Sequence, residues 1–116
     1  MRKVESDLQS SCVCWFRYAY PEYSRLLFAV PNGGSRNVIE AARLKKEGVV
    51  RGVADLLLLV PNKEFHGLCI EMKKKGGYQS EWQKEWQKEV EKQGYLYVVC
   101  KSFAEFMVTI NKYFKP

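Results

Sequence analysis

The sequence has little of what several classes of small protein are built on. It contains one histidine, and its four cysteines form no C-x-x-C pair, so neither a zinc site nor a disulfide framework is expected. Its longest apolar run, from Leu56 to Pro61, is far shorter than the roughly 20 residues that a membrane-spanning helix needs. The N-terminal residues lack the apolar segment of a secretory signal. We expect a cytoplasmic protein with reduced thiols at Cys12, Cys14, Cys69 and Cys100.

The composition is that of an ordinary globular domain. Of the 116 residues, 47% are hydrophobic and 28% are charged, values that disfavour disorder. No linker rich in Gly, Ser or Pro divides the chain, so we expect one domain over residues 1–116. Lys and Arg number 19 against 13 for Asp and Glu, a net charge of +6. This excess favours nucleic acid as the partner and gives no sign of a membrane role.

Apolar periodicity and turn residues predict four helices and four strands. The helices are expected at about residues 4–20, 37–47 and 80–94 and from Ser102 onward, and the strands at 26–30, 53–60, 68–73 and 95–100. Ser80 with Gln83, and Ser102 with Glu105, have the spacing of capping boxes at helix starts. The alternation of helices and strands predicts an α/β fold, with a mixed β-sheet flanked by α-helices.

Asp55 is an acidic residue inside an apolar segment, Val53 to Val60. Its charge loses hydration there unless a partner compensates it. A hairpin that turns at Lys63 sets Asp55 directly across from Glu71, with Cβ atoms roughly 4.5–5.5 Å apart, where like charges repel. The sequence therefore predicts two neighbouring carboxylates that need a positive partner.

Glu71 and Lys73 share one face of the second hairpin strand, whereas Met72 points to the other. Two carboxylates and a neighbouring backbone carbonyl form a hard oxygen site suited to Mg²⁺ or Mn²⁺. Such an ion lowers the pKa of a bound water, and a lysine beside it stabilises negative charge on a phosphate. The pattern fits phosphodiester hydrolysis, and an ion-pair cluster at a strand end is the alternative.

Basic residues cluster in the same segments of the sequence. They precede Asp55 and follow Glu71, as expected of a rim that tracks phosphates, although a solvated charged face has the same pattern. Gln87 lies one helical turn beyond Gln83, so a polar strip on that helix can reach a phosphate. The candidate nucleic-acid contacts are Arg36, Arg43, Lys45, Lys46, Arg51, Lys74, Lys75 and Gln87.

Several short motifs follow one another in a fixed order along nearly the whole chain. They are Glu5, Pro31-Asn32-Gly33-Gly34, Arg36, Leu44-x-x-Glu47-Gly48-Val49, Gly52-Val53-Ala54-Asp55-Leu56, Ile70-Glu71-Met72-Lys73, Ser80-x-x-Gln83-x-x-Trp86 and Gly94-Tyr95. In this combination the sequence resembles the virus-type replication-repair nuclease (VRR-NUC) family of the PD-(D/E)XK superfamily. Ala54 stands where the superfamily name has proline, a position that shapes the strand entry and donates no ligand.

The resemblance implies a restriction-endonuclease-like (PD-(D/E)XK) fold and phosphodiester cleavage that depends on Mg²⁺ or Mn²⁺. It implies metal ligation by Asp55, Glu71 and the Met72 carbonyl, and a catalytic role for Lys73. It further implies that Glu5 and Gln83 complete the metal and catalytic site. Each of these two has a simpler role open to it, since Glu5 complements a helix dipole and Gln83 caps a helix.

Stand-alone members of this size resemble phage enzymes that act on branched DNA, including four-way (Holliday) junctions, often as homodimers. A two-fold pair of sites can cut two strands symmetrically. We therefore expect a structure-specific DNA endonuclease in the cytoplasm of a phage host or bacterial cell. Two alternatives stay open: a nuclease-derived module that binds nucleic acid without cleavage, and a nicking endonuclease on linear duplex DNA. The two acids argue against the first alternative, because carboxylates that face a phosphate give no advantage to a protein that only binds nucleic acid.

Overall fold

The computed structural model describes residues 3–31 and 37–115. Within these ranges the elements follow the predicted order, with one short 3-10 helix added after the first α-helix. They are α1 (Lys3–Ala19), η1 (Pro21–Tyr23), β1 (Leu27–Ala29), α2 (Val38–Lys46), β2 (Leu56–Leu58), β3 (Leu68–Met72), α3 (Glu81–Lys92), β4 (Leu96–Cys100) and α4 (Phe103–Phe114). The described part of the chain has no helix long and apolar enough to cross a membrane.

The four strands form one mixed sheet in the order β1-β2-β3-β4. β1 and β3 each pair with β2 antiparallel, and β4 pairs with β3 parallel. Leu56 lies opposite Ile70, and Leu58 lies opposite Leu68. One step further along this register Asp55 comes opposite Glu71, so the predicted hairpin register is confirmed.

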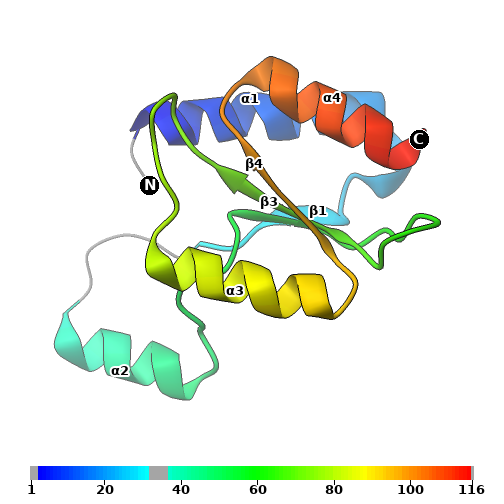
Figure 1. Cartoon of the computed structure of the whole chain (residues 1–116). Coiled ribbons are helices and arrows are strands. Elements are labelled where there is room, and N and C mark those ends of the chain that lie inside the picture. The colour runs from blue at the N-terminus through cyan, green and yellow to red at the C-terminus, as the bar shows by residue number, and fades with distance from the viewer. Residues whose placement is uncertain (1–2, 32–36, 116) are drawn as a thin grey trace.

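Helices cover both faces of the sheet, α1 and α4 on one side and α3 on the other (Figure 1). Even-numbered residues of β2 and β3 join the main core beneath α1 and α4, where Phe16, Phe106 and Ile110 are fully buried. Odd-numbered residues of these two strands face α3, where Cys69 joins Ala54 and Tyr97 in a smaller cluster packed against Trp86 and Val90. Glu71 belongs to this odd-numbered set, so its side chain lies on the α3 face.

Two expectations need correction. The strand predicted over Val53 to Val60 is only three residues long, and Leu59 is 54% exposed, so this segment is not covered on both faces throughout. Helix α2 buries none of its residues, and Val38 on it is 86% exposed; the helix lies apart from the sheet, beyond α3 (Figure 1).

Candidate active site

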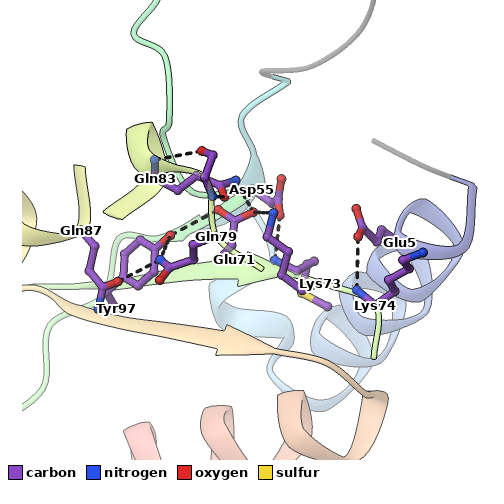
Figure 2. Close-up of polar contacts among 11 residues, drawn as sticks. Glu5, Asp55, Glu71, Lys73, Lys74, Gln79, Gln83, Gln87 and Tyr97 are labelled. Atoms are coloured by element: carbon purple, nitrogen blue, oxygen red, sulfur yellow. Dashed lines mark hydrogen bonds and ion pairs between the residues drawn. The ribbon is translucent and has the colours of Figure 1, made fainter. Parts of the chain in front are cut away.

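Asp55 and Glu71 meet where β2 begins and β3 ends. The Asp55 carboxylate accepts a hydrogen bond of 2.7 Å from the backbone N–H of Met72, which ties it to the neighbouring strand. Glu71 is only 2% exposed, and Figure 2 shows its carboxylate beside that of Asp55. The hairpin therefore holds the two acids together, as its register predicts.

Donors from three elements surround the Glu71 carboxylate (Figure 2). Gln83 Nε2 on α3 lies 2.9 Å from Glu71 Oε2, and Lys73 Nζ lies 3.6 Å from the same oxygen. The Tyr97 hydroxyl on β4 lies 3.3 Å from Oε1. Both carboxylate oxygens of Glu71 are thus held by neutral or cationic donors.

Burial, the negative charge of Asp55 and a hydrogen bond with Asp55, in that order, raise the pKa of Glu71 from 4.5 to about 8, although Lys73 and Tyr97 act in the opposite direction. The single positive charge of Lys73 does not balance the negative charges of both Asp55 and Glu71. Glu71 without a further cation is therefore mostly protonated at neutral pH, which is the behaviour of a carboxylate pair that needs an added positive charge.

The residues present fit a hard divalent ion. Asp55 and Glu71 offer carboxylate oxygens side by side, the donors that Mg²⁺ and Mn²⁺ prefer, and their mutual repulsion is what a cation would relieve. Residues 3–31 and 37–115 contain no group of three or more His, Cys, Asp or Glu side chains placed to hold a metal. A pair of carboxylates suits Mg²⁺, which usually keeps several waters and binds substrate phosphate.

Glu5, from the first turn of α1, accepts a hydrogen bond of 3.2 Å from the Lys74 backbone N–H. This contact brings α1 to the end of β3, next to the carboxylate pair (Figure 2). The structure gives Glu5 this backbone partner and does not make it a third member of an acidic cluster. Its role as a metal ligand, like that of the Met72 carbonyl, stays a prediction.

Gln83 caps the start of α3 and also contacts Glu71, and its catalytic role stays a prediction. Its Oε1 accepts from the Ser80 backbone N–H at 2.8 Å while the Ser80 hydroxyl accepts from the Gln83 backbone N–H, which completes the capping box. Its Nε2 donates to Glu71. The cap fixes which end of the amide faces the site, because the oxygen is already used at the helix start.

Sequence reasoning missed Tyr97 and Gln79. Gln79 Nε2 donates to the Tyr97 hydroxyl at 3.2 Å and to Gln87 Oε1 at 2.9 Å, and Gln87 Nε2 donates to Glu91 at 3.1 Å. The signal available in the sequence is the repeat in α3, Glu-Trp-Gln-Lys-Glu-Trp-Gln-Lys, which sets Gln83 and Gln87 one turn apart. Gln87 lies in this network, and its role as a nucleic-acid contact stays a prediction.

The predicted basic residues fall into two groups. Arg43, Lys45 and Lys46 are exposed on α2, where Arg43 pairs with Glu47 at 2.9 Å. Arg51, Lys74 and Lys75 lie nearer the carboxylates, in the segments that lead into β2 and out of β3. Arg36 and the turn Asn32-Gly33-Gly34 lie outside the described residues.

Arg51 rests on an aromatic ring beside the site. Its guanidinium carbon is 4.7 Å from the centroid of the Trp82 ring, a cation–π arrangement, and Trp82 is 49% exposed. The pair borders a cleft of about 890 Å³ between α2 and α3, whose other lining residues include Leu44, Val50, Glu85 and Glu89. Gln83, which follows Trp82 directly, donates to Glu71, so one turn of α3 carries both this ring and a residue of the candidate site.

The mixed sheet, its helices on both faces and an Asp opposite a Glu-x-Lys on the next strand define a PD-(D/E)XK-like fold. The family model for the VRR-NUC domain matches residues 2–104. A solved structure described as a VRR_NUC domain protein is 29% identical, with a TM-score of 0.83 over 96% of this chain and 88% of that one. A comparison with curated proteins gives no match. The chain belongs to the VRR-NUC domain family, and its function is of the nuclease type.

Proposed function

We propose that the protein is a Mg²⁺- or Mn²⁺-dependent endodeoxyribonuclease that hydrolyses phosphodiester bonds in branched DNA, such as four-way junctions. One observation carries the proposal: buried Glu71 lies beside Asp55, and Lys73 lies on the same face. A structural ion pair needs one acid and one base. The second acid, which raises the pKa of the first, is explained by a site for a divalent cation.

Each residue of the site has a defined part in this reaction. Asp55 and Glu71 hold the ion, with the Met72 carbonyl and Glu5 as further candidate ligands. When bound, the ion would lower the pKa of a water and offset charge on the phosphate. Lys73, whose ammonium nitrogen lies 3.6 Å from Glu71 Oε2, stabilises the negative charge that develops on the phosphate.

Gln83 acts on Glu71 and on the helix start together. Its amide N–H donates to Glu71 Oε2, which favours the ionised carboxylate that a metal ligand must be. The hydrogen bond from the Ser80 backbone N–H to Gln83 Oε1 fixes the Gln83 side chain at the helix start. The position of its N–H donor is therefore set by the helix. We assign Gln83 to the catalytic site as the residue that fixes the orientation of Glu71.

Nucleic acid as the substrate is supported by charge and by position. The net charge is +6, and Arg51, Lys74 and Lys75 lie in the segments that adjoin the carboxylates. Basic residues of this kind bind the phosphates of nucleic acid irrespective of the base sequence. The choice of branched DNA rests on the resemblance to stand-alone family members, and the homodimer on the need for two sites to cut two strands symmetrically.

A cleavage assay on matched substrates tests the proposal. Purified protein is incubated with a labelled four-way junction, a flap and a linear duplex, each with Mg²⁺, Mn²⁺ or EDTA. We expect symmetric incision of the junction with metal, no incision in EDTA, and a sedimentation mass near twice that of the chain. Binding without incision in every metal identifies the module that binds without cleavage, and cleavage of the linear duplex at an equal rate identifies the nicking enzyme.

A further inference from the structure

Tyr97 brings a hydroxyl group into the layer between the sheet and α3. It lies on β4 opposite Cys69 of β3, is 5% exposed, and its ring centroid is 6.2 Å from that of Trp86. Its other neighbours in this layer include Ala54. Phenylalanine has the same ring and would fill this space equally well, so packing does not account for the hydroxyl.

The polar partners of this hydroxyl lead to Glu71 at one end and to Gln79 at the other. Its oxygen lies 3.3 Å from Glu71 Oε1 and 3.2 Å from Gln79 Nε2. Gln79 Nε2 also lies 2.9 Å from Gln87 Oε1. The three side chains come from β3, β4 and the segment before α3, and Figure 2 shows them in one row.

Hydrogen-bond chemistry fixes the direction of this chain. An amide nitrogen only donates, so Gln79 gives one N–H to Gln87 and the other to the Tyr97 oxygen. The Tyr97 oxygen accepts from Gln79, and its own proton is then free to point to Glu71. At the far end Gln87 Nε2 donates to the Glu91 carboxylate at 3.1 Å, which leaves Gln87 Oε1 as the acceptor that Gln79 requires.

We infer that Tyr97, oriented by Gln79 and Gln87, is a positioning residue that holds Glu71 Oε1 in place for the binding of a divalent cation. Gln83 holds the other oxygen from α3. Two donors on two oxygens, from different elements, set the plane of the carboxylate relative to Asp55. This inference rests on the proposed function, because it assigns Glu71 to a metal.

The test is the affinity for Mn²⁺ measured by calorimetry on the full chain without DNA. Groups that orient a metal ligand typically contribute 10- to 100-fold in metal affinity, so we expect Tyr97→Phe to raise the Mn²⁺ dissociation constant by about 10-fold or more. Gln79→Ala, which leaves the Tyr97 hydroxyl without its orienting donor, is expected to raise it in the same direction and by less. Circular dichroism verifies that each variant is folded.

Tyr113→Phe is the matched control. The Tyr113 hydroxyl is also buried and donates to the Val60 carbonyl at 2.7 Å, in the main core on the other face of the sheet. Its loss removes a buried hydrogen bond of the same kind, so thermal stability falls while Mn²⁺ affinity stays at the wild-type value. A general effect of losing a buried hydroxyl would weaken Mn²⁺ binding in both Tyr variants.

The outcomes separate this inference from the function on which it rests. Wild-type protein that binds Mn²⁺, with Tyr97→Phe and Gln79→Ala binding it equally well, overturns the positioning role and leaves the metal site intact. Wild-type protein that fails to bind Mn²⁺ overturns both. If Tyr97→Phe does not fold, Gln79→Ala decides, since Gln79 lies outside the helices and strands: weaker Mn²⁺ binding supports the role, and unchanged binding overturns it.

Discussion

The Asp55 carboxylate is bonded to the backbone N–H of Met72, 2.7 Å away, between Glu71 and Lys73. A single hydrogen bond thus links the acid that precedes β2 to the Glu-x-Lys sequence of β3. Because Met72 is part of the backbone pairing with β4, its N–H is fixed in space. Asp55 is held at the site by the sheet itself, which suits a ligand whose position must not vary.

Lys73→Met should reduce turnover without abolishing DNA binding. The ammonium group lies 3.6 Å from Glu71 and is assigned to the charge that develops on the phosphate. Loss of one such stabilising group typically costs about 10²–10³-fold in kcat. Single-turnover cleavage of a labelled four-way junction measures this. Lys84→Met removes the same charge from the exposed pair with Glu81 and is expected to cut at the wild-type rate; equal rates in both variants contradict the role of Lys73.

The stability of the metal-free protein should fall as the pH rises from 5 to 8. The pKa of Glu71 is about 8 in the folded chain against 4.5 for an unperturbed carboxyl. Between these pH values the folded state holds a proton that the unfolded state has lost. Each rise of one pH unit therefore lowers the free energy of unfolding, and the equilibrium constant for unfolding increases by up to about tenfold. Denaturant titrations in EDTA measure this slope.

Glu71→Gln is the control for that slope, because glutamine keeps the shape and carries no titrating proton. Its stability should vary less with pH than that of the wild type over the same range. Addition of Mg²⁺ to the wild type should also reduce the slope, since a bound cation favours the ionised carboxylate. Wild type and Glu71→Gln with the same pH dependence would show that Glu71 titrates normally.

Arg51→Ala should weaken binding of all DNA substrates to a similar degree. Arg51 stacks on Trp82 and is assigned to a phosphate. Removal of one phosphate contact should reduce the slope of log affinity against log salt by about 1. Fluorescence anisotropy over a salt series, in EDTA to prevent cleavage, gives this slope. Lys63→Ala, in the hairpin loop between β2 and β3, removes the same charge and should leave the slope unchanged.

Gly52 should be far less tolerant of alanine than Gly48. Both have positive φ, +88° and +104°, a conformation that costs a residue with a Cβ about 1 kcal/mol or more. A Cβ at Gly52 would also lie 2.5 Å from the Trp82 carbonyl oxygen, whereas one at Gly48 meets nothing within 4 Å. We expect Gly52→Ala to cost about 1–3 kcal/mol more unfolding free energy than Gly48→Ala, as overpacking does. Equal costs would show that the loop before Asp55 is not packed on α3.

The carboxylate pair was predictable because the centre of a hairpin determines which residues of its two strands lie opposite each other. Once Lys63 marks the turn, residues on the two strands are assigned to each other, and burial of one face leaves little freedom to slip. Helix starts at Ser80 and Ser102 were predictable for a similar reason, since their caps depend only on neighbouring residues.

Tyr97 was not predictable by the same means. β4 joins the sheet parallel to β3 through α3, and the length of such a crossover does not determine which residue of β4 lies beside Glu71.

The position of α2 could not be predicted for another reason. Its apolar residues have helical spacing, yet Val38 and Ile39 are exposed, and periodicity alone does not reveal whether a helix packs on the sheet.

We propose that Asp55 and Glu71 share one divalent cation. A crystal structure of the protein with Mn²⁺, recorded at a wavelength where manganese scatters anomalously, shows whether they do. We expect one anomalous peak within bonding distance of a carboxylate oxygen of each residue, and no peak there in crystals of Glu71→Gln. Crystals that hold Mn²⁺ elsewhere, or whose two carboxylates turn away from each other with no peak between them, would contradict it.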